Sequence, residues 1–299
     1  MIRDWKRALR ELLVDDEAVS LITVVEARGS TPRDEGAWLA VGRESFMGTI
    51  GGGALEFDAM ARARNLLNQD GLWLRQTIDQ PLGPNLGQCC GGHVRLLLER
   101  IGKIEMAELE RLSEDAPTYH PMESGAPVSD IAAKTGAGRN SAYQRPAPEP
   151  PRSLFVYGAG HVGRSLMAIT GDLGFDRTWV DISPDRFPPS VPDDIDVLVA
   201  SDPATAASYA PDNALHLVMT HDHALDQEIC GVLLKKGRFG FLGLIGSDTK
   251  RNRFIRRLSG AGIDQAMLDQ LICPVGIRSI TGKDPARVAL SIAAQLASL

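Results

Sequence analysis

Two adjacent cysteines stand in a glycine-rich stretch of this chain, Gly83-Pro84-Asn85-Leu86-Gly87-Gln88-Cys89-Cys90-Gly91-Gly92-His93. Glycine and proline keep such a segment out of helix and sheet, and glycine lets the backbone approach a ligand closely. Adjacent cysteines rarely bond to each other, because the small ring strains the disulfide. Cys89 and Cys90 are therefore candidate soft ligands for a metal or sulfur centre, or a sulfur acceptor. The alternative is that small residues pack a tight corner and the thiols do no chemistry.

A second segment with anion-binding potential is Glu26-Ala27-Arg28-Gly29-Ser30-Thr31-Pro32-Arg33, which follows an apolar stretch at 21–25 that predicts a buried strand. It holds two arginines, two hydroxyls and a glycine, Ser30 supplying one of the hydroxyls. The guanidinium of Arg28 or Arg33 can pair with two oxygens of one anion. An arginine-rich surface loop would have the same composition, so both interpretations stay open.

A run of three glycines, Gly51, Gly52 and Gly53, leads into a segment with apolar residues at helical spacing. A helix start exposes several N–H groups at the positive end of the helix dipole, which suits a phosphate or a pterin. Tight packing of a strand against a helix would also require glycine. If the loops at 28–33, 48–54 and 83–93 converge in space, this half of the chain holds an anionic, sulfur-binding ligand.

The second half of the chain opens with an apolar strand at 154–157 that runs into a G-x-G-x-x-G motif made by Gly158, Gly160 and Gly163. A helical pattern follows the motif, and a further strand ends at Asp181. The acid stands about 20 residues beyond the motif, where a ribose-binding carboxylate is expected. This context predicts a Rossmann-like unit, although the fold alone does not establish dinucleotide binding.

Three ionisable residues follow the strand predicted at 216–220, namely His221, His223 and Asp226. Loops at the carboxyl ends of parallel strands are where α/β sheets bind ligands. The two histidines could ligate a metal with Asp226 as a third or orienting group. They could equally cap the helix expected at 224–234 and contact a cofactor. Later in the chain, Ser247 and Asp284 are expected to cap two further helices.

Composition limits the class of protein. The 299 residues are 43% hydrophobic and 23% charged with a formal net charge of −6, which suits a two-domain soluble chain and argues against a general nucleic-acid binder. Neither a signal peptide nor a run of apolar residues long enough for a membrane span is recognisable. Four cysteines do not make a secreted disulfide framework at this length, so we expect a reducing cytoplasm.

The pattern of elements predicts an α/β protein, with a small N-terminal α/β domain followed by a Rossmann-like parallel-sheet domain. The expected divisions are 1–115 for the first domain, 116–152 for a proline-rich linker and 153–299 for the second domain. The linker is expected because prolines and small polar residues replace apolar periodicity after residue 116.

Taken together, the motifs resemble those of the XdhC/CoxI family, whose members are accessory proteins of xanthine dehydrogenase and related molybdenum hydroxylases. In the first half the matching motifs are Ala27-Arg28-Gly29-Ser30-Thr31-Pro32-Arg33, Gly48-Thr49-Ile50-Gly51-Gly52-Gly53-Ala54-Leu55-Glu56 and Gly87-Gln88-Cys89-Cys90-Gly91-Gly92. In the second half they are the segments 158–163, 220–226, 243–247 and 282–285. The resemblance covers nearly the whole chain apart from residues 116–150.

The resemblance implies a chaperone rather than a catalyst. Such a protein would bind molybdenum cofactor (molybdopterin), protect it while a cysteine desulfurase exchanges an oxo ligand for sulfur, and deliver it to an apo xanthine dehydrogenase-type hydroxylase. Cys89 or Cys90 would act as a soft ligand of molybdenum, beside Gln88 of the same motif. The loops of Arg28, Ser30 and Arg33 and of Gly51–53 would hold the phosphate, and a homodimer is expected.

Two alternatives compete with this interpretation. The first is an NAD(P)-dependent oxidoreductase that uses the Rossmann unit, with a nucleotide at Gly158, Gly160, Gly163 and Asp181 and with His221 nearby. The second is a thiol redox or metal-storage protein that uses the cysteine pair together with the two histidines. The first leaves the cysteine turn unexplained.

Overall fold

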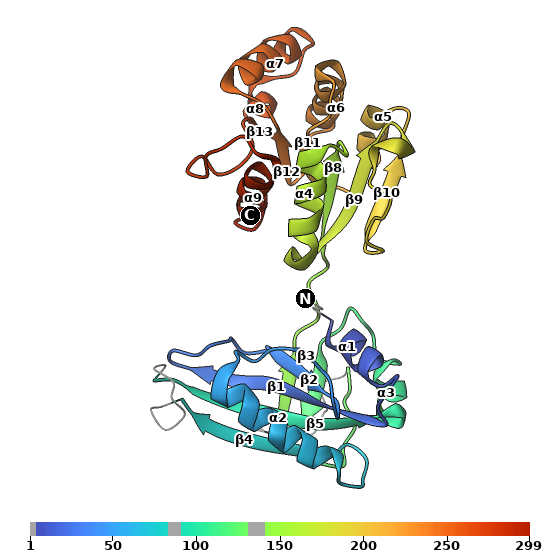
Figure 1. The fold of residues 1–299 in the computed structure, drawn as a ribbon, viewed down its shortest axis with the longest axis vertical. Coiled ribbons are helices and arrows are strands. Elements are labelled where there is room, and N and C mark those ends of the chain that lie inside the picture. Colours follow the sequence, from blue (N-terminus) through green and yellow to red (C-terminus); the bar gives the residue numbers. More distant parts are fainter. Residues whose placement is uncertain (1–3, 83–90, 131–140) are drawn as a thin grey trace. The chain divides into compact units, whose positions relative to one another are not determined.

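The computed structural model describes residues 4–82, 91–130 and 141–299. The chain forms two compact units, which are residues 1–149 and residues 150–299 (Figure 1). Each unit is built around its own sheet. The first unit holds an antiparallel sheet and the second a parallel one, which confirms the expected α/β class.

The sheet of the first unit has five strands in the order β3-β2-β1-β5-β4. Their bounds are β1 Ala18–Arg28, β2 Trp38–Val41, β3 Phe46–Gly48, β4 Arg75–Pro81 and β5 His93–Gly102. The two longest strands, β1 and β5, pair through the middle, from Ala18 opposite Gly102 to Arg28 opposite His93. Residues 72–78 read as one apolar strand in the sequence, but β4 begins only at Arg75, because Trp73 has a φ of 52° that a strand does not accommodate.

Helices cover both faces of this sheet. One face packs on α2 (Gly53–Leu67) through an aliphatic cluster that includes Ile22, Leu39 and Leu96. The other face packs on α1 (Trp5–Leu12) and α3 (Lys103–Leu109). Since strand side chains alternate between faces, the same strands supply both clusters.

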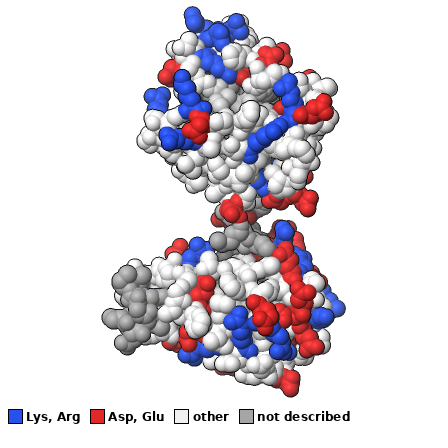
Figure 2. All heavy atoms as spheres, in the orientation of Figure 1, with Lys and Arg blue, Asp and Glu red and all other residues white. Residues whose placement is uncertain are grey.

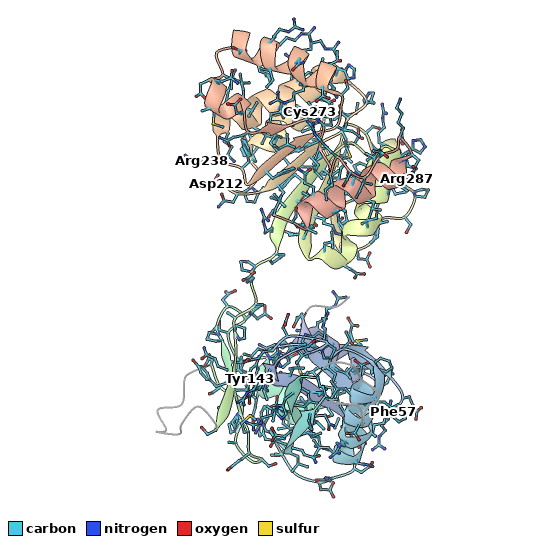
Figure 3. All side chains as sticks on the ribbon, turned by 90° about the vertical axis from the view of Figure 1, so that its left-hand side faces the viewer. Phe57, Tyr143, Asp212, Arg238, Cys273 and Arg287 are labelled. Carbon is cyan, nitrogen blue, oxygen red and sulfur yellow. The ribbon has the colours of Figure 1, made fainter. Side chains whose placement is uncertain are left out.

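The segment expected to be a linker packs against the first unit in its described part. Strands β6 (Thr118–Pro121) and β7 (Ala142–Arg145) form a two-stranded antiparallel sheet. Val128 joins the cluster of α1 and α3, and Tyr143, labelled in Figure 3, is 7% exposed. Sequence composition is misleading here, because the prolines stand beside a few large buried side chains. The sequence Ile131-Ala132-Ala133-Lys134 suggests a short helical turn, but these residues lie outside the described ones.

The second unit has a six-stranded parallel sheet in the order β10-β9-β8-β11-β12-β13. The bounds are β8 Arg152–Tyr157, β9 Phe175–Asp181, β10 Ile195–Val199, β11 Leu215–Val218, β12 Phe241–Leu244 and β13 Leu271–Ile272. Counted from β8, this is the order 3-2-1-4-5-6 of a dinucleotide-binding Rossmann sheet. From β8 the strand order runs to one side through β9 and β10 and to the other side through β11, so the switch point lies between β8 and β11. Ligands bind at the switch point in such folds.

Helices cover both faces of the parallel sheet. On one face lie α4 (His161–Thr170) and α9 (Pro285–Leu296). On the other lie α5 (Pro203–Ser208), α6 (His223–Lys236), α7 (Asp248–Gly260) and α8 (Gln265–Leu268). Ser247 and Asp284 accept hydrogen bonds from the amides of Lys250 and Arg287, which confirms both as caps. The cap of α6 is Asp222 rather than a neighbouring histidine.

Candidate functional site

Three loops of the first unit meet at the start of β5. A Cβ atom placed on Gly92 would lie 2.3 Å from the carbonyl oxygen of Ser30 and 2.7 Å from that of Arg28. A Cβ atom on Gly51 would lie 2.5 Å from Cβ of Pro32. The loop at 28–33 is therefore held between the triple-glycine turn and Gly92, and only residues without a side chain permit this approach.

Gln88, Cys89 and Cys90 lie outside the described residues. The residues that follow them are described: Gly91 is exposed, and a Cβ atom on it would meet nothing within 4 Å. On the other side of the segment, the amide of Leu82 donates to the carbonyl of Gly92 at 2.8 Å. The cysteine pair is thus flanked in sequence by residues that belong to the meeting point of the loops.

The triple-glycine turn carries its own carboxylate. Glu56, in the first turn of α2, accepts hydrogen bonds from Thr49 Oγ1 at 2.7 Å and from the amides of Ile50 and Gly52, both at 3.0 Å. The amide of Gly51 donates to Thr49 Oγ1 at 3.1 Å. The donors before the helix are therefore used within the turn, and an anion would meet the amides of the helix's first turn, beginning at Gly53. Gly52 has open space around its Cα.

The two arginines of the 28–33 loop differ in their surroundings. Arg28 pairs with Glu26, which also lies 3.5 Å from a guanidinium nitrogen of Arg95. Arg33 is exposed, and within the described residues no carboxylate lies within salt-bridge distance of it. Arg33 is consequently the guanidinium of this loop that has its charge available to an anionic ligand.

In the second unit, two glycines of the motif are required by packing. A Cβ atom on Gly158 would lie 2.4 Å from the carbonyl oxygen of Met219, and one on Gly163 would lie 2.2 Å from that of Gly158. Gly158 also has a φ of 118°, which favours glycine. Gly160 alone of the three has open space at its Cβ position. It precedes the helix α4, where a ligand can approach the turn.

Asp181 lies at the end of β9, beside this glycine turn, as the motif predicts. Its carboxylate accepts from the amide of Ala159 at 2.7 Å and from the amide of Ile182 at 2.7 Å. The side chain is buried, with the residue 7% exposed. Asp181 therefore holds the glycine turn in place, and each of its oxygens already has a protein donor.

The loop after β11 does not form a metal site, one of the two alternatives for its residues. Asp226 is fully buried and accepts from Lys250 Nζ at 2.7 Å and from Thr220 Oγ1 at 2.7 Å. His221 and His223 are exposed and accept hydrogen bonds from arginines. Within residues 4–82, 91–130 and 141–299, no group of three histidines, cysteines or acids can hold a metal.

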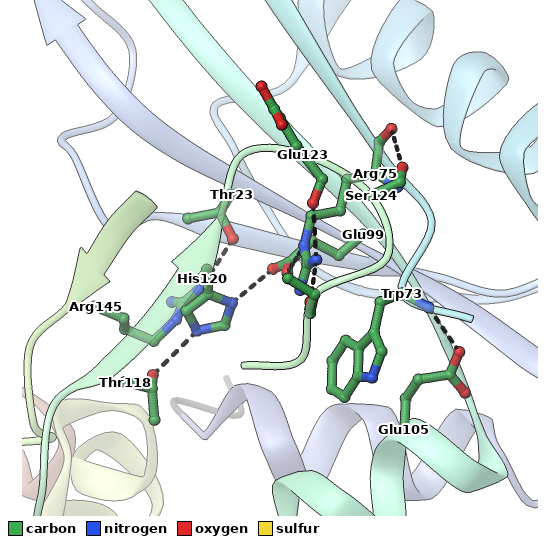
Figure 4. A network of polar contacts seen from close by, with 11 residues as sticks. Thr23, Trp73, Arg75, Glu99, Glu105, Thr118, His120, Glu123, Ser124 and Arg145 are labelled. Carbon is green, nitrogen blue, oxygen red and sulfur yellow. Dashed lines mark hydrogen bonds and ion pairs between the residues drawn. The ribbon is translucent and has the colours of Figure 1, made fainter. Parts of the chain in front are cut away.

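Sequence reasoning missed a buried polar network in the first unit (Figure 4). Glu99 accepts from Arg75 Nε at 2.9 Å and lies 2.7 Å from Nδ1 of His120, whose Nε2 is 3.0 Å from Oγ1 of Thr118. Burial alone would raise the pKa of Glu99, but the charges and hydrogen bonds of His120 and Arg75 lower it to about 2. The sequence did contain one signal of this network, namely charged residues inside apolar strands.

The acid, histidine and hydroxyl of this network are arranged as in a nucleophilic triad, but Thr118 is only 4% exposed. A nucleophile must reach its substrate. On the same face, Arg145 donates to Thr23 Oγ1 at 2.6 Å and lies over the ring of Trp5 at 5.0 Å. These contacts fasten β6 and β7 to the sheet, so the network is structural.

The two cysteines that the structure describes lie in the interior of the second unit. Cys230 and Cys273 are buried and free. Burial raises the pKa of the Cys273 thiol to about 11 and that of Cys230 further still. Because the thiolate is the metal ligand and nucleophile, raised pKa values make both thiols poor candidates for such chemistry. No helix within the described ranges is long and apolar enough to cross a membrane.

Comparison with known proteins gives matches in both units. Residues 12–76 match the model of the XdhC and CoxI family, and residues 154–296 match that of the XdhC Rossmann domain. A crystal structure of a xanthine dehydrogenase (BH1974) from Bacillus halodurans superposes with a TM-score of 0.77 at 22% identity, covering 97% of this chain and 94% of that one. At that identity, the likeness shows the fold.

Curated relatives align along nearly the entire chain. A Bacillus subtilis (strain 168) protein, named as a probable xanthine dehydrogenase subunit, is 26% identical over 96% of this chain and 95% of its own length. The "Molybdenum cofactor insertion chaperone PaoD" of Escherichia coli (strain K12) is 24% identical, over 97% and 86%. The uncharacterized protein YqeB of Escherichia coli (strain K12) is 27% identical over 93% of this chain, which spans 42% of the length of YqeB.

Proposed function

This chain belongs to the XdhC and CoxI family, and we propose that it is an accessory protein that binds molybdenum cofactor and delivers it to a molybdenum hydroxylase. Its cargo would be held by the first unit during sulfuration by a cysteine desulfurase, and the receiving enzyme would be an apo xanthine dehydrogenase or a relative. The name of PaoD, which is similar along most of its length, supports this proposal.

The observation that carries the proposal is the contact of the 28–33 loop with Gly51 on one side and Gly92 on the other. Gly92 comes directly after Cys89-Cys90-Gly91 in the sequence. The contact therefore brings a guanidinium-bearing loop and a helix start to the end of the segment that carries the adjacent thiols. Thiolates suit molybdenum and sulfur, and the other two loops suit a phosphate.

The residues present fit such a cargo, and their roles can be divided. Cys89 or Cys90, with Gln88 beside them, would contact the metal end of the molecule. Ser30 and Arg33, and the amides that begin at Gly53, would contact its phosphate. Gly52 and Gly91, around which there is open space, would leave room for the pterin.

An NAD(P)-dependent oxidoreductase is less well supported. The strand order and the glycine turn suit a dinucleotide. The carboxylate of Asp181, however, would have to accept from the ribose hydroxyls, and it already accepts from two backbone amides. The cysteine turn would have no part in such a reaction. Retention of a nicotinamide nucleotide that reacts with substrate would favour this alternative over ours.

The proposal is tested by measuring molybdopterin after co-expression in a host that makes the cofactor. The readout is the fluorescent oxidised pterin released from the purified wild type, from Cys89→Ser and from Cys90→Ser. We expect wild type to carry pterin and at least one variant to lose most of it, because serine is a poor ligand for a soft metal.

The matched control is Cys230→Ala, which removes a buried thiol of the other unit. This variant should retain pterin, and melting temperatures establish that all variants are folded. Wild-type protein without pterin, or two cysteine variants that retain the wild-type amount, would contradict the proposal.

A further inference from the structure

We propose that the second unit binds a phosphate group in a pocket at the carboxyl ends of β11 and β12, beside and distinct from the glycine turn. The group is a phosphomonoester or diphosphate carried by a nucleotide. This site lies wholly in the second unit and goes beyond the proposed function, which rests on the first.

The pocket has a volume of about 400 Å³ and is lined by polar side chains of two loops and one helix. Thr220, His221 and His223 come from the loop after β11 and the start of α6. Ser247, Lys250 and Arg253 come from the cap and first turns of α7. Convergent polar groups from separate elements in one hollow are the mark of a ligand site.

Two arginines at the pocket are not neutralised by acids. Arg253 donates to Nδ1 of His223 at 3.3 Å, and Arg186 donates to Nε2 of His221 at 3.2 Å. Across the described ranges, neither arginine has a carboxylate within 4.0 Å, and the same is true of Arg256 and Arg257 on α7. In Figure 2, Lys and Arg gather where Figure 1 places α7. The chain as a whole carries a formal charge of −6, whereas α7 holds five basic residues and one acid.

The base of the pocket is fixed by a buried ion pair. Lys250 Nζ lies 2.7 Å from Asp226 and 2.9 Å from the carbonyl oxygen of Ile245, while Asp226 also accepts from the amide of Thr220 at 3.0 Å. Asp226 thus compensates the charge of Lys250 and ties the two loops together. The charge left for a ligand is that of Arg253, with Arg186 bonded to His221 of the lining.

The N-terminus of α7 adds to the positive charge at the pocket. The helix runs for 13 residues, and the hydroxyl of its N-cap Ser247 accepts from the amide of Lys250 at 3.2 Å. A helix N-terminus favours an anion, and arginine pairs with phosphate through two parallel hydrogen bonds. These effects act in the same direction as the uncompensated guanidinium groups.

The glycine turn is a poorer place for the phosphate. Gly158 and Gly163 are closed by packing, and the buried carboxylate of Asp181 lies against the amide of Ala159. A negative charge there opposes a second one. The Cβ position of Gly158 is only 3.2 Å from Cα of Thr220, so the glycine turn and the pocket adjoin. The carboxylate of Asp181 disfavours phosphate at the turn, whereas the guanidinium of Arg253 favours it in the pocket.

The test is calorimetric titration of the full-length protein with pyrophosphate at low ionic strength. We expect Arg253→Ala to weaken binding by about tenfold or more, since it removes a charge-assisted pair. Arg256→Ala is the matched control, an exposed arginine of the same helix outside the pocket lining. Gly160→Val fills the open position of the glycine turn. Both controls should bind as wild type does.

Several outcomes would overturn the proposal. These are absence of binding at millimolar pyrophosphate, equal losses in Arg253→Ala and Arg256→Ala, and a loss in Gly160→Val that Arg253→Ala does not share. The second outcome would mean that only general surface charge is at work. The third would place the phosphate at the glycine turn.

Two further measurements test whether a nucleotide carries the phosphate. If ADP competes with pyrophosphate and Arg253→Ala retains its pterin, the ligand is a nucleotide. If ADP does not compete, or if Arg253→Ala loses pterin, the assignment to a nucleotide is wrong. A wild type that carries no pterin would end the proposed function, while the pyrophosphate titration would still decide this site.

Discussion

Glu99 is a charged residue within an apolar strand, and it forms the centre of the contacts that hold β6 and β7 in place. It is 1% exposed, and both of its oxygens are used, one by Arg75 and one by His120. Removing one partner of such a buried group leaves the others without compensation, which costs more than the pair contributes. The importance of this residue is therefore structural.

The stability of the first unit should depend on pH through Glu99. The ordinary pKa of a glutamate is 4.5, and the pKa of Glu99 in the folded protein is lowered to about 2. Because the folded value is the lower one, the stabilisation is complete above pH 4.5 and is lost as the pH falls toward 2. We expect Glu99→Gln to lower the free energy of unfolding by roughly 3 kcal/mol at neutral pH and to flatten its acid dependence.

Denaturant titration at several pH values measures this effect. Glu110→Gln, which changes an exposed acid of the same unit, serves as the control and should unfold as wild type does. An acid dependence as steep in Glu99→Gln as in wild type would show that other groups are responsible.

At the scale of elements, the meeting of three loops depends on Gly92 more than on its neighbour. A Cβ atom on Gly92 would overlap two backbone oxygens, those of Ser30 and Arg28, and neither can turn away as a side chain can. A Cβ atom on Gly91 would enter open space. Gly92→Ala should therefore cost about 1–3 kcal/mol of stability and displace the 28–33 loop, whereas Gly91→Ala should be tolerated.

The adjacent positions make a matched pair for one experiment. Melting temperature and bound pterin are measured for both variants after co-expression. Equal effects of the two substitutions would mean that the loops do not touch as described, and that the convergence is not what supports cofactor binding.

Several elements could be predicted from the sequence, and the reasons are local. The strand before Gly158, the helix after it and the caps Ser247 and Asp284 follow from patterns only a few residues long. The convergence of 28–33 with Gly51 and Gly92 could be stated only as a condition, because it depends on strand pairing between distant residues.

The parts that sequence reasoning missed depend on contacts across the chain. The ion pair of Lys250 and Asp226 joins two helices, and the role of His120 depends on Glu99 in another strand. Prolines after residue 116 predicted a linker, but composition does not show that Arg145 pairs with Thr23. The roles assigned to Cys89 and Cys90 stay a prediction.

At the scale of the whole molecule, the first unit should fold without the second but not without its last residues. We expect a fragment of residues 1–149 to melt cooperatively, since it retains the network of Glu99 and the strands β6 and β7. A fragment of residues 1–115, the domain expected from composition, lacks His120, Val128 and Arg145. It should expose apolar surface and bind a hydrophobic dye.

Circular dichroism and dye binding on the two fragments check this prediction. The fragment 150–299, prepared in parallel, should melt on its own as well. Equal cooperativity of the fragments 1–115 and 1–149 would mean that the β6–β7 sheet is dispensable.

The boundary between Glu149 and Pro150 also has a consequence for biosynthesis. Every strand of the antiparallel sheet finds its partners among residues made before Pro150, and the parallel sheet uses only residues made after it. Nascent chains emerge at about 5–20 residues per second and fold domain by domain, so the first unit can close while the ribosome is still translating the second. The segment that carries the cysteine pair would then belong to a folded unit before the C-terminal half of the protein leaves the exit tunnel.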